Sequence, residues 1–164
     1  MPLFAPDQLT LAAEALAAAS AKDIRIVTAE TCTAGLVSAC LTSVSGASKT
    51  FERGFVLYHD SAKATGLGVP EAIAREHGAV SAEVTQGLAE GALLHSTAEV
   101  SVAVTGYAGP GGGNAKNPVG TVYVASARKG RPSVVERHRF TGDRDGVRSA
   151  AVGAALAVLL RQLV

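Results

Sequence analysis

The stretch that decides the fold is "IRIVTAETCTAGLVSACLTSV", residues 24–44, where a short β-branched run passes into an apolar helical pattern. Residues 24–29 predict a buried strand, because they are few and rich in Ile and Val. Residues 33–44 predict a helix with apolar residues at helical spacing. Ligands of open α/β sheets bind at the carboxyl ends of such strands. We therefore expect the polar residues Glu30 to Thr33 to lie at a ligand-binding edge.

The rest of the chain continues this alternation of helices and strands. Its turn and cap signals give the order α-β-α-β-α-α-α-β-β-β-α. This order predicts an α/β fold with three layers, α/β/α, around a mixed sheet whose early β-α-β part is parallel and whose late part is antiparallel. One domain over residues 1–164 fits the length. The remaining predicted strands are 53–59, 98–106, 119–127 and 133–140, and the remaining predicted helices are 7–21, 60–68, 70–78, 81–96 and 143–164.

Composition excludes several classes of function. Hydrophobic residues make up 48% of the 164, charged residues 18%, and the formal charge is +1. Without a basic stripe, and with only 4% aromatic residues, no nucleic-acid partner is expected. No uncharged apolar run reaches the ~18–20 residues of a membrane span, so we expect no membrane partner. The two cysteines do not form a disulfide framework, which predicts a cytoplasmic protein. The four histidines lack the spacing of metal ligands, and we expect no metal or other cofactor.

The turn after the first strand has several chemical interpretations. Thr31 or Thr33 is either a nucleophile or the N-cap of the following helix, and capping is the commoner role. Free backbone N–H groups at the helix start can hold an anion or an oxyanion. Cys32 lies in the same turn, where a helix N-terminus favours the thiolate. No histidine is adjacent in sequence to serve as its base.

Two further segments carry polar groups that can join this turn. In "YHDSAK" (58–63), Tyr58 follows the second predicted strand and Lys63 lies one turn into a helix of small residues. A lysine drawn inward there is a usable base, whereas a surface position is the simpler alternative. "TGYAGPGGG" (105–113) follows the strongest strand, and its glycines allow a close approach of the backbone to a ligand such as a phosphate. It matches neither a Walker A sequence nor a dinucleotide-binding fingerprint.

The segment "TGDRDGVR" (141–148) opens the last predicted helix. Thr141 is a candidate cap, and Asp143 and Asp145 suit the first helical turn. Arg144 and Arg148 lie one turn apart and can bind a phosphate or pair with those acids.

Taken together, these segments resemble the C-terminal domain of the competence/damage-inducible CinA proteins. The resemblance is carried, in order, by "AETCTAGL", "FERGFVLYHDSAK", "GVP…HGAVS", "AVTGYAGPGGG…NPVGTVYVA" and "TGDRDGVR", and it covers almost the whole chain. Stand-alone members of that family hydrolyse nicotinamide mononucleotide to nicotinate mononucleotide and ammonia, in pyridine nucleotide recycling. The resemblance thus implies an amidohydrolase with a small nucleotide substrate, and a self-associating homo-oligomer.

The resemblance also implies roles for residues. Family members attack with a serine at the position of Thr31, and the lysine and tyrosine of their motif correspond to Lys63 and Tyr58. The catalytic candidates are therefore Thr31, Lys63 and Tyr58. Ser48, in the next loop, is a reserve nucleophile. The substrate-binding candidates are Glu30, Cys32, Thr33, Ser48, Gly106, Ala108, Gly109, Gly111 and Arg144.

This chain departs from the family pattern at a few positions. It has Thr31 in place of serine, Ala34 in place of glycine, and His59 and Asp60 where "SN" or "TN" is common. Threonine can act as a nucleophile, but its γ-methyl group restricts χ1 and crowds the path of attack. The alternative to an active amidohydrolase is a weakened or inactive paralogue that binds a pyridine nucleotide.

Overall fold

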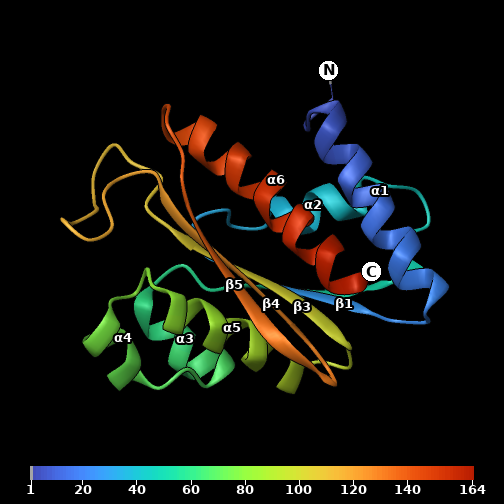
Figure 1. The fold of residues 1–164 in the computed structure, drawn as a ribbon, viewed down its shortest axis with the longest axis horizontal. Helices are drawn as coiled ribbons and strands as arrows, with labels where there is room; N and C mark the ends of the chain where they lie inside the picture. The colour runs from blue at the N-terminus through green and yellow to red at the C-terminus, as the bar shows by residue number, and fades with distance from the viewer. Residues whose placement is uncertain (1) are drawn as a thin grey trace.

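The computed structural model describes residues 2–164, and a five-stranded mixed sheet forms its centre (Figure 1). The strand order is β2-β1-β3-β4-β5. β1 pairs in parallel with both β2 and β3, and β4 runs antiparallel to both β3 and β5, which confirms the predicted mixed sheet. The strands are β1 Ile26–Glu30, β2 Phe51–Val56, β3 Val100–Gly106, β4 Thr121–Arg128 and β5 Arg131–Arg139.

Helices cover both faces of this sheet. Figure 1 shows α1, α2 and α6 on one face and α3, α4 and α5 on the other, so the predicted three layers are present. Each face has its own apolar core, since alternate residues of a strand point to opposite faces. The helices are α1 Pro6–Ala21, α2 Leu36–Thr42, α3 Asp60–Leu67, α4 Glu71–His77, α5 Ala82–Leu94 and α6 Arg144–Leu163, with a short 3₁₀ helix, η1, at Ala47–Lys49.

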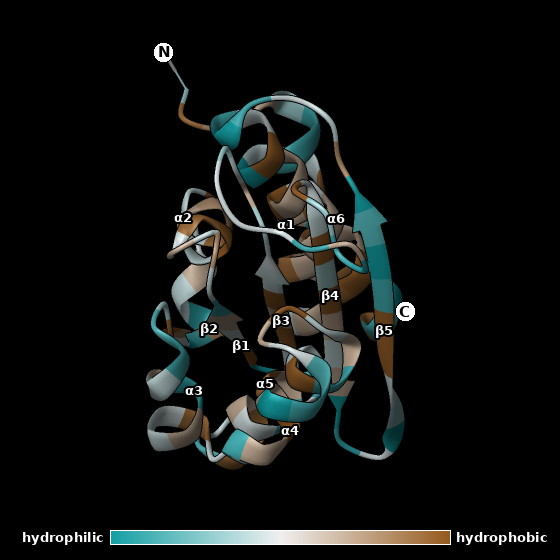
Figure 2. Cartoon of the chain, turned by 90° about the vertical axis from the view of Figure 1, so that its left-hand side faces the viewer, coloured by the Kyte–Doolittle hydropathy of each residue, from teal (hydrophilic) through white to brown (hydrophobic). Residues whose placement is uncertain are grey.

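The central strands are the apolar part of the sheet. β3 and β4 are buried along almost their whole length, whereas β5 alternates exposed and half-buried residues. Figure 2 shows this contrast, with brown predominating in β3 and teal covering much of β5. A polar edge strand of this kind discourages pairing with another sheet.

Helix α6 owes its apolar composition to the core. By length and composition it could cross a membrane, yet half of its apolar window is buried inside the structure. It packs against α1 and against β3 and β4.

The predicted caps and boundaries are correct only in part. Ser81, the first residue of the predicted helix 81–96, caps α5 by accepting a hydrogen bond from the Val84 amide. His59 caps α3, and Asp143 caps α6 in place of the candidate Thr141. Thr141 and Asp143 can each accept a hydrogen bond at a helix start, so the backbone direction at the start of α6 decides between them.

Candidate active site

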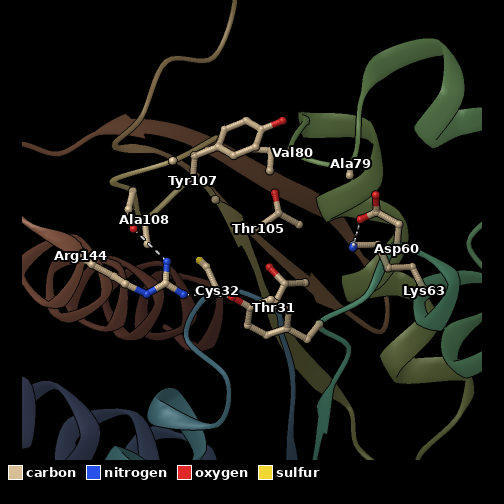
Figure 3. A pocket seen from close by; sticks show the side chains of 14 residues that line it. Thr31, Cys32, Asp60, Lys63, Ala79, Val80, Thr105, Tyr107, Ala108 and Arg144 are labelled. Atoms are coloured by element: carbon tan, nitrogen blue, oxygen red, sulfur yellow. Dashed lines mark hydrogen bonds and ion pairs between the residues drawn. The ribbon is translucent and has the colours of Figure 1, made fainter. Parts of the chain in front are cut away.

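One cavity of about 280 Å³ opens at the carboxyl ends of β1 and β3 (Figure 3). Segments far apart in the sequence meet there: the β1–α2 turn, the start of α3, the loop before α5, the β3 end with its glycine-rich loop, and the start of α6. Of the twelve residues predicted for the site, nine line the cavity: Thr31, Cys32, Tyr58, Lys63, Gly106, Ala108, Gly109, Gly111 and Arg144. Glu30, Thr33 and Ser48 do not.

Thr31 is the first residue after β1 and its side chain is buried in the cavity wall. Its hydroxyl donates a hydrogen bond of 2.9 Å to the carbonyl oxygen of Val104 on the neighbouring strand β3. This bond orients the oxygen and leaves its lone pairs free for another donor. Thr31 is therefore an oriented hydroxyl at the sheet edge and not the cap of α2.

Lys63 is a buried lysine in the first half of α3, as the inward alternative predicted. Its side chain is 6% exposed, and Nζ donates to Oδ1 of Asp60 at 3.0 Å. Asp60 lies one turn earlier and its side chain is 72% exposed. An ammonium group has three N–H donors, so this single partner leaves Nζ with free hydrogen-bonding capacity in the cavity. Asp60 also lines the cavity; the sequence marked it only as a departure from the family pattern and did not include it among the site residues.

Glu30 has a structural role that sequence reasoning missed. Its carboxylate is buried and accepts hydrogen bonds from the amides of Val37 and Ser38 at 2.9 and 3.0 Å. It also accepts the hydroxyls of Thr33 and Ser38, each at 2.7 Å. An acid thus satisfies the N-terminus of α2 from within the chain, so the side chains of Glu30 and Thr33 are engaged in this local network and do not line the cavity.

The backbone conformation of the turn explains why α2 begins at Leu36 and not near Thr33. Ala34 and Gly35 take positive φ angles of 46° and 99°, so the turn must complete a left-handed step before the helix starts. Glycine adopts this region freely and alanine does not. Ala34 therefore carries a conformational cost at the position where the family resemblance has glycine.

The turn between Thr31 and Ala34 presents backbone donors. Within residues 2–164, the amide N–H groups of Cys32 and Thr33 have no hydrogen-bond acceptor. The carbonyl oxygen of Cys32 is held by Nε of Arg148 at 3.0 Å, which fixes the orientation of the peptide. Of these two residues Cys32 lines the cavity, and a backbone donor beside an oriented hydroxyl suits an oxyanion.

Cys32 itself is a poor nucleophile. Burial, the largest effect, raises the pKa of its thiol to about 11, against a smaller lowering by the hydrogen bond with Thr31. At neutral pH the group is therefore a protonated thiol. The thiolate that the turn suggested is not favoured, because α2 starts beyond the cysteine and burial outweighs any dipole.

Arg144 lines the side of the cavity opposite Lys63 (Figure 3). Its guanidinium donates to the carbonyl oxygen of Gly109 and to the hydroxyl of Tyr58, both at 2.9 Å. A single cation therefore connects the glycine-rich loop to the segment after β2. Tyr58 is 60% exposed, so this bond holds it at the mouth of the cavity and not in its depth.

Ser48 lies elsewhere. It belongs to η1 and lines a separate surface hollow formed by residues 42, 44–48 and 51. The structure therefore gives no geometric support to Ser48 as a reserve nucleophile. Proximity to the turn in sequence was misleading, because α2 carries the chain away from the sheet edge.

Sequence reasoning missed several lining residues: Asp60, Ala79, Val80, Thr105 and Tyr107. Thr105 had a detectable signal, since it is the one hydroxyl residue near the end of the most apolar strand. Ala79 and Val80 had none, because only the packing of α4 and α5 brings their loop to the cavity. Within residues 2–164, no group of three or more His, Cys, Asp or Glu side chains is placed to hold a metal ion.

The fold and cavity define an α/β protein with a hydroxyl and a lysine at the carboxyl edge of its sheet. The family model described as the CinA C-terminal domain matches residues 8–163. The chain belongs to the CinA C-terminal domain family.

Individual relatives agree with this assignment. The nicotinamide-nucleotide amidohydrolase PncC of Escherichia coli K12 is 43% identical over 147 residues, which are 90% of this chain and 89% of that protein. A crystal structure of the competence/damage inducible protein CihA from Agrobacterium tumefaciens superposes with a TM-score of 0.95 at 38% identity, covering 98% of both chains.

Longer relatives match only in part. A putative competence-damage inducible protein of Caldicellulosiruptor bescii is 43% identical over 143 residues, which are 87% of this chain and 34% of that protein. The chain thus spans about a third of the length of such relatives. Their whole-protein properties do not follow from this match.

Proposed function

We propose that this chain is an amidohydrolase that converts nicotinamide mononucleotide and water to nicotinate mononucleotide and ammonia. The observation that carries the proposal is the presence of Thr31 and Lys63 in one cavity, beside two unpaired backbone donors. A nucleophile, a base and an oxyanion site are the parts that amide hydrolysis requires. The similarity to an amidohydrolase over 90% of the chain supports the same reaction class.

In this mechanism, Lys63 acts as the base that takes the hydroxyl proton of Thr31 while Oγ1 attacks the carboxamide carbon. The amides of Cys32 and Thr33 stabilise the negative oxygen of the tetrahedral intermediate. The C–N bond then breaks, and the lysine returns the proton to the departing ammonia. Water cleaves the nicotinoyl ester by the same route, which releases the acid and restores Thr31.

The remaining lining groups suit the nucleotide part of the substrate. In this proposal Arg144 and the backbone of Gly109 and Gly111, which line the cavity, hold ribose and phosphate, because guanidinium and backbone amides are the usual partners of phosphate oxygens. Tyr58 at the mouth can relay the proton that leaves with ammonia. Self-association as a homo-oligomer belongs to the same proposal, with light scattering as its measurement.

A second function, nucleotide binding without turnover, is favoured by a specific observation. The Thr31 hydroxyl is bonded to Val104 and the Lys63 amine to Asp60, so nucleophile and base do not contact each other in this structure. To turn its hydroxyl toward Lys63, Thr31 must rotate about χ1 and move its γ-methyl group within a buried wall. A serine has no such methyl group. The cavity can thus bind a ligand and react slowly or not at all.

The test is ammonia release from nicotinamide mononucleotide by the wild type and by Thr31→Ala, Thr31→Ser and Lys63→Ala. We expect Thr31→Ala and Lys63→Ala to lose at least about 100-fold in kcat, since each removes one half of the nucleophile–base pair. Thr31→Ser is expected to gain activity, because it removes the crowding methyl group. Ser48→Ala, outside the cavity, is the matched hydroxyl control and should retain full activity.

The outcomes separate the two functions. Equal rates for the wild type and Thr31→Ala would exclude Thr31 as the nucleophile. Calorimetric binding of the nucleotide without turnover in the wild type would establish the binding protein instead. A panel of nicotinamide-containing compounds distinguishes a changed substrate from lost activity.

A further inference from the structure

A chain of buried hydroxyl groups leads from the cavity wall into helix α5. Thr105 Oγ1 lies 2.8 Å from Thr85 Oγ1, and Thr85 Oγ1 lies 2.6 Å from the carbonyl oxygen of Ser81. Thr85 is fully buried and Thr105 is 1% exposed. Thr105 lines the cavity, where Figure 3 shows its side chain in the same wall as Thr31 and Tyr107.

The direction of the hydrogen bonds in this chain is fixed by chemistry. A carbonyl oxygen can only accept, so the single hydroxyl hydrogen of Thr85 must point at Ser81. Thr85 then has only lone pairs to offer to Thr105, and Thr105 must donate its own hydrogen to Thr85. The oxygen of Thr105 consequently has no hydrogen left for the cavity, and it can act there only as an acceptor.

We propose that Thr105 is a specificity-determining residue that accepts a hydrogen bond from the substrate carboxamide and disfavours the carboxylate product. The proposal rests on the amidohydrolase function above. A carboxamide NH₂ carries two donors, whereas an ionised carboxylate carries only acceptors. An acceptor whose hydrogen is locked away therefore attracts the amide and repels the acid, which helps product to leave.

The strand geometry places this acceptor where the reaction needs it. Thr105 is the last but one residue of β3, next to Val104, whose carbonyl holds the Thr31 hydroxyl. Ser101 and Thr105 both bond to α5, because residues four apart on a strand share a face. Thr31, Cys32 and Thr105 line the same cavity, so a carboxamide attacked by Thr31 lies beside the wall that contains Thr105.

The experiment measures binding without turnover. Dissociation constants of nicotinamide mononucleotide and nicotinate mononucleotide are determined by calorimetry in a Thr31→Ala background, alone and combined with Thr105→Val or Thr85→Val. Thr105→Val removes the acceptor. Thr85→Val leaves Thr105 intact but frees its hydrogen to turn toward the cavity.

Thr105→Val should mainly weaken the binding of the amide, whereas Thr85→Val should mainly strengthen the binding of the acid. Thr105→Val is expected to weaken binding of the amide by about 10-fold and to leave or improve binding of the acid. Thr85→Val is expected to tighten binding of the acid by about 10-fold, with little change for the amide. If Thr85 had only a structural role, Thr85→Val would weaken the binding of both ligands to the same extent.

Ser101→Ala is the matched control. Its buried hydroxyl donates to the Ala89 carbonyl of α5 at 2.7 Å, so its loss disturbs the same β3–α5 contact outside the cavity. The ratio of the two dissociation constants should not change. An unchanged ratio in Thr85→Val and Thr105→Val would overturn the proposal while leaving the amidohydrolase intact. Failure of both ligands to bind the Thr31→Ala protein would overturn both.

Discussion

Glu30 shows how much a single residue decides at the candidate site. In the sequence it stands beside Thr31 and resembles a polar group offered to a ligand. In the structure its carboxylate accepts four hydrogen bonds from the start of α2 and its flanking hydroxyls. Because the carboxylate satisfies those donors, the anion-binding capacity of the turn shifts to the amides of Cys32 and Thr33.

Cys32 leads to a prediction at the same scale. Burial raises the pKa of its thiol to about 11, above the ordinary value of 9.0 that it regains on unfolding. The unfolded state therefore loses this proton first as the pH rises. The stabilisation by the buried neutral thiol is complete below about pH 9 and is lost as the pH rises toward 11.

We expect the free energy of unfolding of the wild type to fall more steeply between about pH 9 and 11 than that of Cys32→Ala. Denaturant titrations at several pH values measure this difference, and subtracting the variant removes the contribution of lysines and tyrosines. Parallel curves for the two proteins would contradict the assigned effect of burial.

At the scale of elements, the contact between α3 and α5 positions Lys63. Gly91 of α5 lies against Leu67 of α3 so closely that an added Cβ would collide with the Leu67 carbonyl oxygen. A Cβ added at Gly153 of α6 would have no neighbouring atom within 4 Å. The two glycines are both helical and differ mainly in this packing.

Gly91→Ala and Gly153→Ala should therefore change stability in opposite directions. Gly91→Ala is expected to destabilise by about 1–3 kcal/mol, because overpacking outweighs the better helix propensity of alanine, and to lower activity by shifting α3. Gly153→Ala should stabilise by roughly 0.5–1 kcal/mol with activity unchanged. Thermal unfolding and ammonia release measure both effects. Stabilisation by Gly91→Ala would show that the helices can separate without cost.

At the scale of the whole molecule, the cavity is closed by both helical layers. α6 supplies Arg144 from one face of the sheet, and α3 supplies Lys63 from the other. A ligand that contacts both layers binds only the folded protein and so stabilises it as a unit.

Nicotinamide mononucleotide at about 100 times its dissociation constant should stabilise the Thr31→Ala protein by about 2.7 kcal/mol. For a domain of this size the midpoint of thermal unfolding then rises by roughly 5–10 °C. Scanning calorimetry measures the shift, with adenosine monophosphate as a nucleotide that lacks the carboxamide. A midpoint that does not respond to nicotinamide mononucleotide at saturating concentration would speak against the proposed ligand.

Much of the fold was predictable, because it depends on patterns within single segments. The β-branched runs around Val27 and Val102 and the turn signals between them specify strands, and the order of elements specifies a mixed sheet with helices on both faces. Capping residues were less predictable. Thr141 and Asp143 can both accept a hydrogen bond at a helix start, so the local sequence does not choose between them.

What the sequence by itself determined was the mixed sheet, the family, and the presence of Thr31 and Lys63. Hydrophobic periodicity and short motifs are local properties, and a single chain displays them without folding. Only the tertiary structure decided that Glu30 caps α2, that Ser48 lies away from the cavity, and that Thr105 offers an acceptor. Each of these depends on contacts between segments far apart in the chain, where burial and the direction of hydrogen bonds set what a side chain can do.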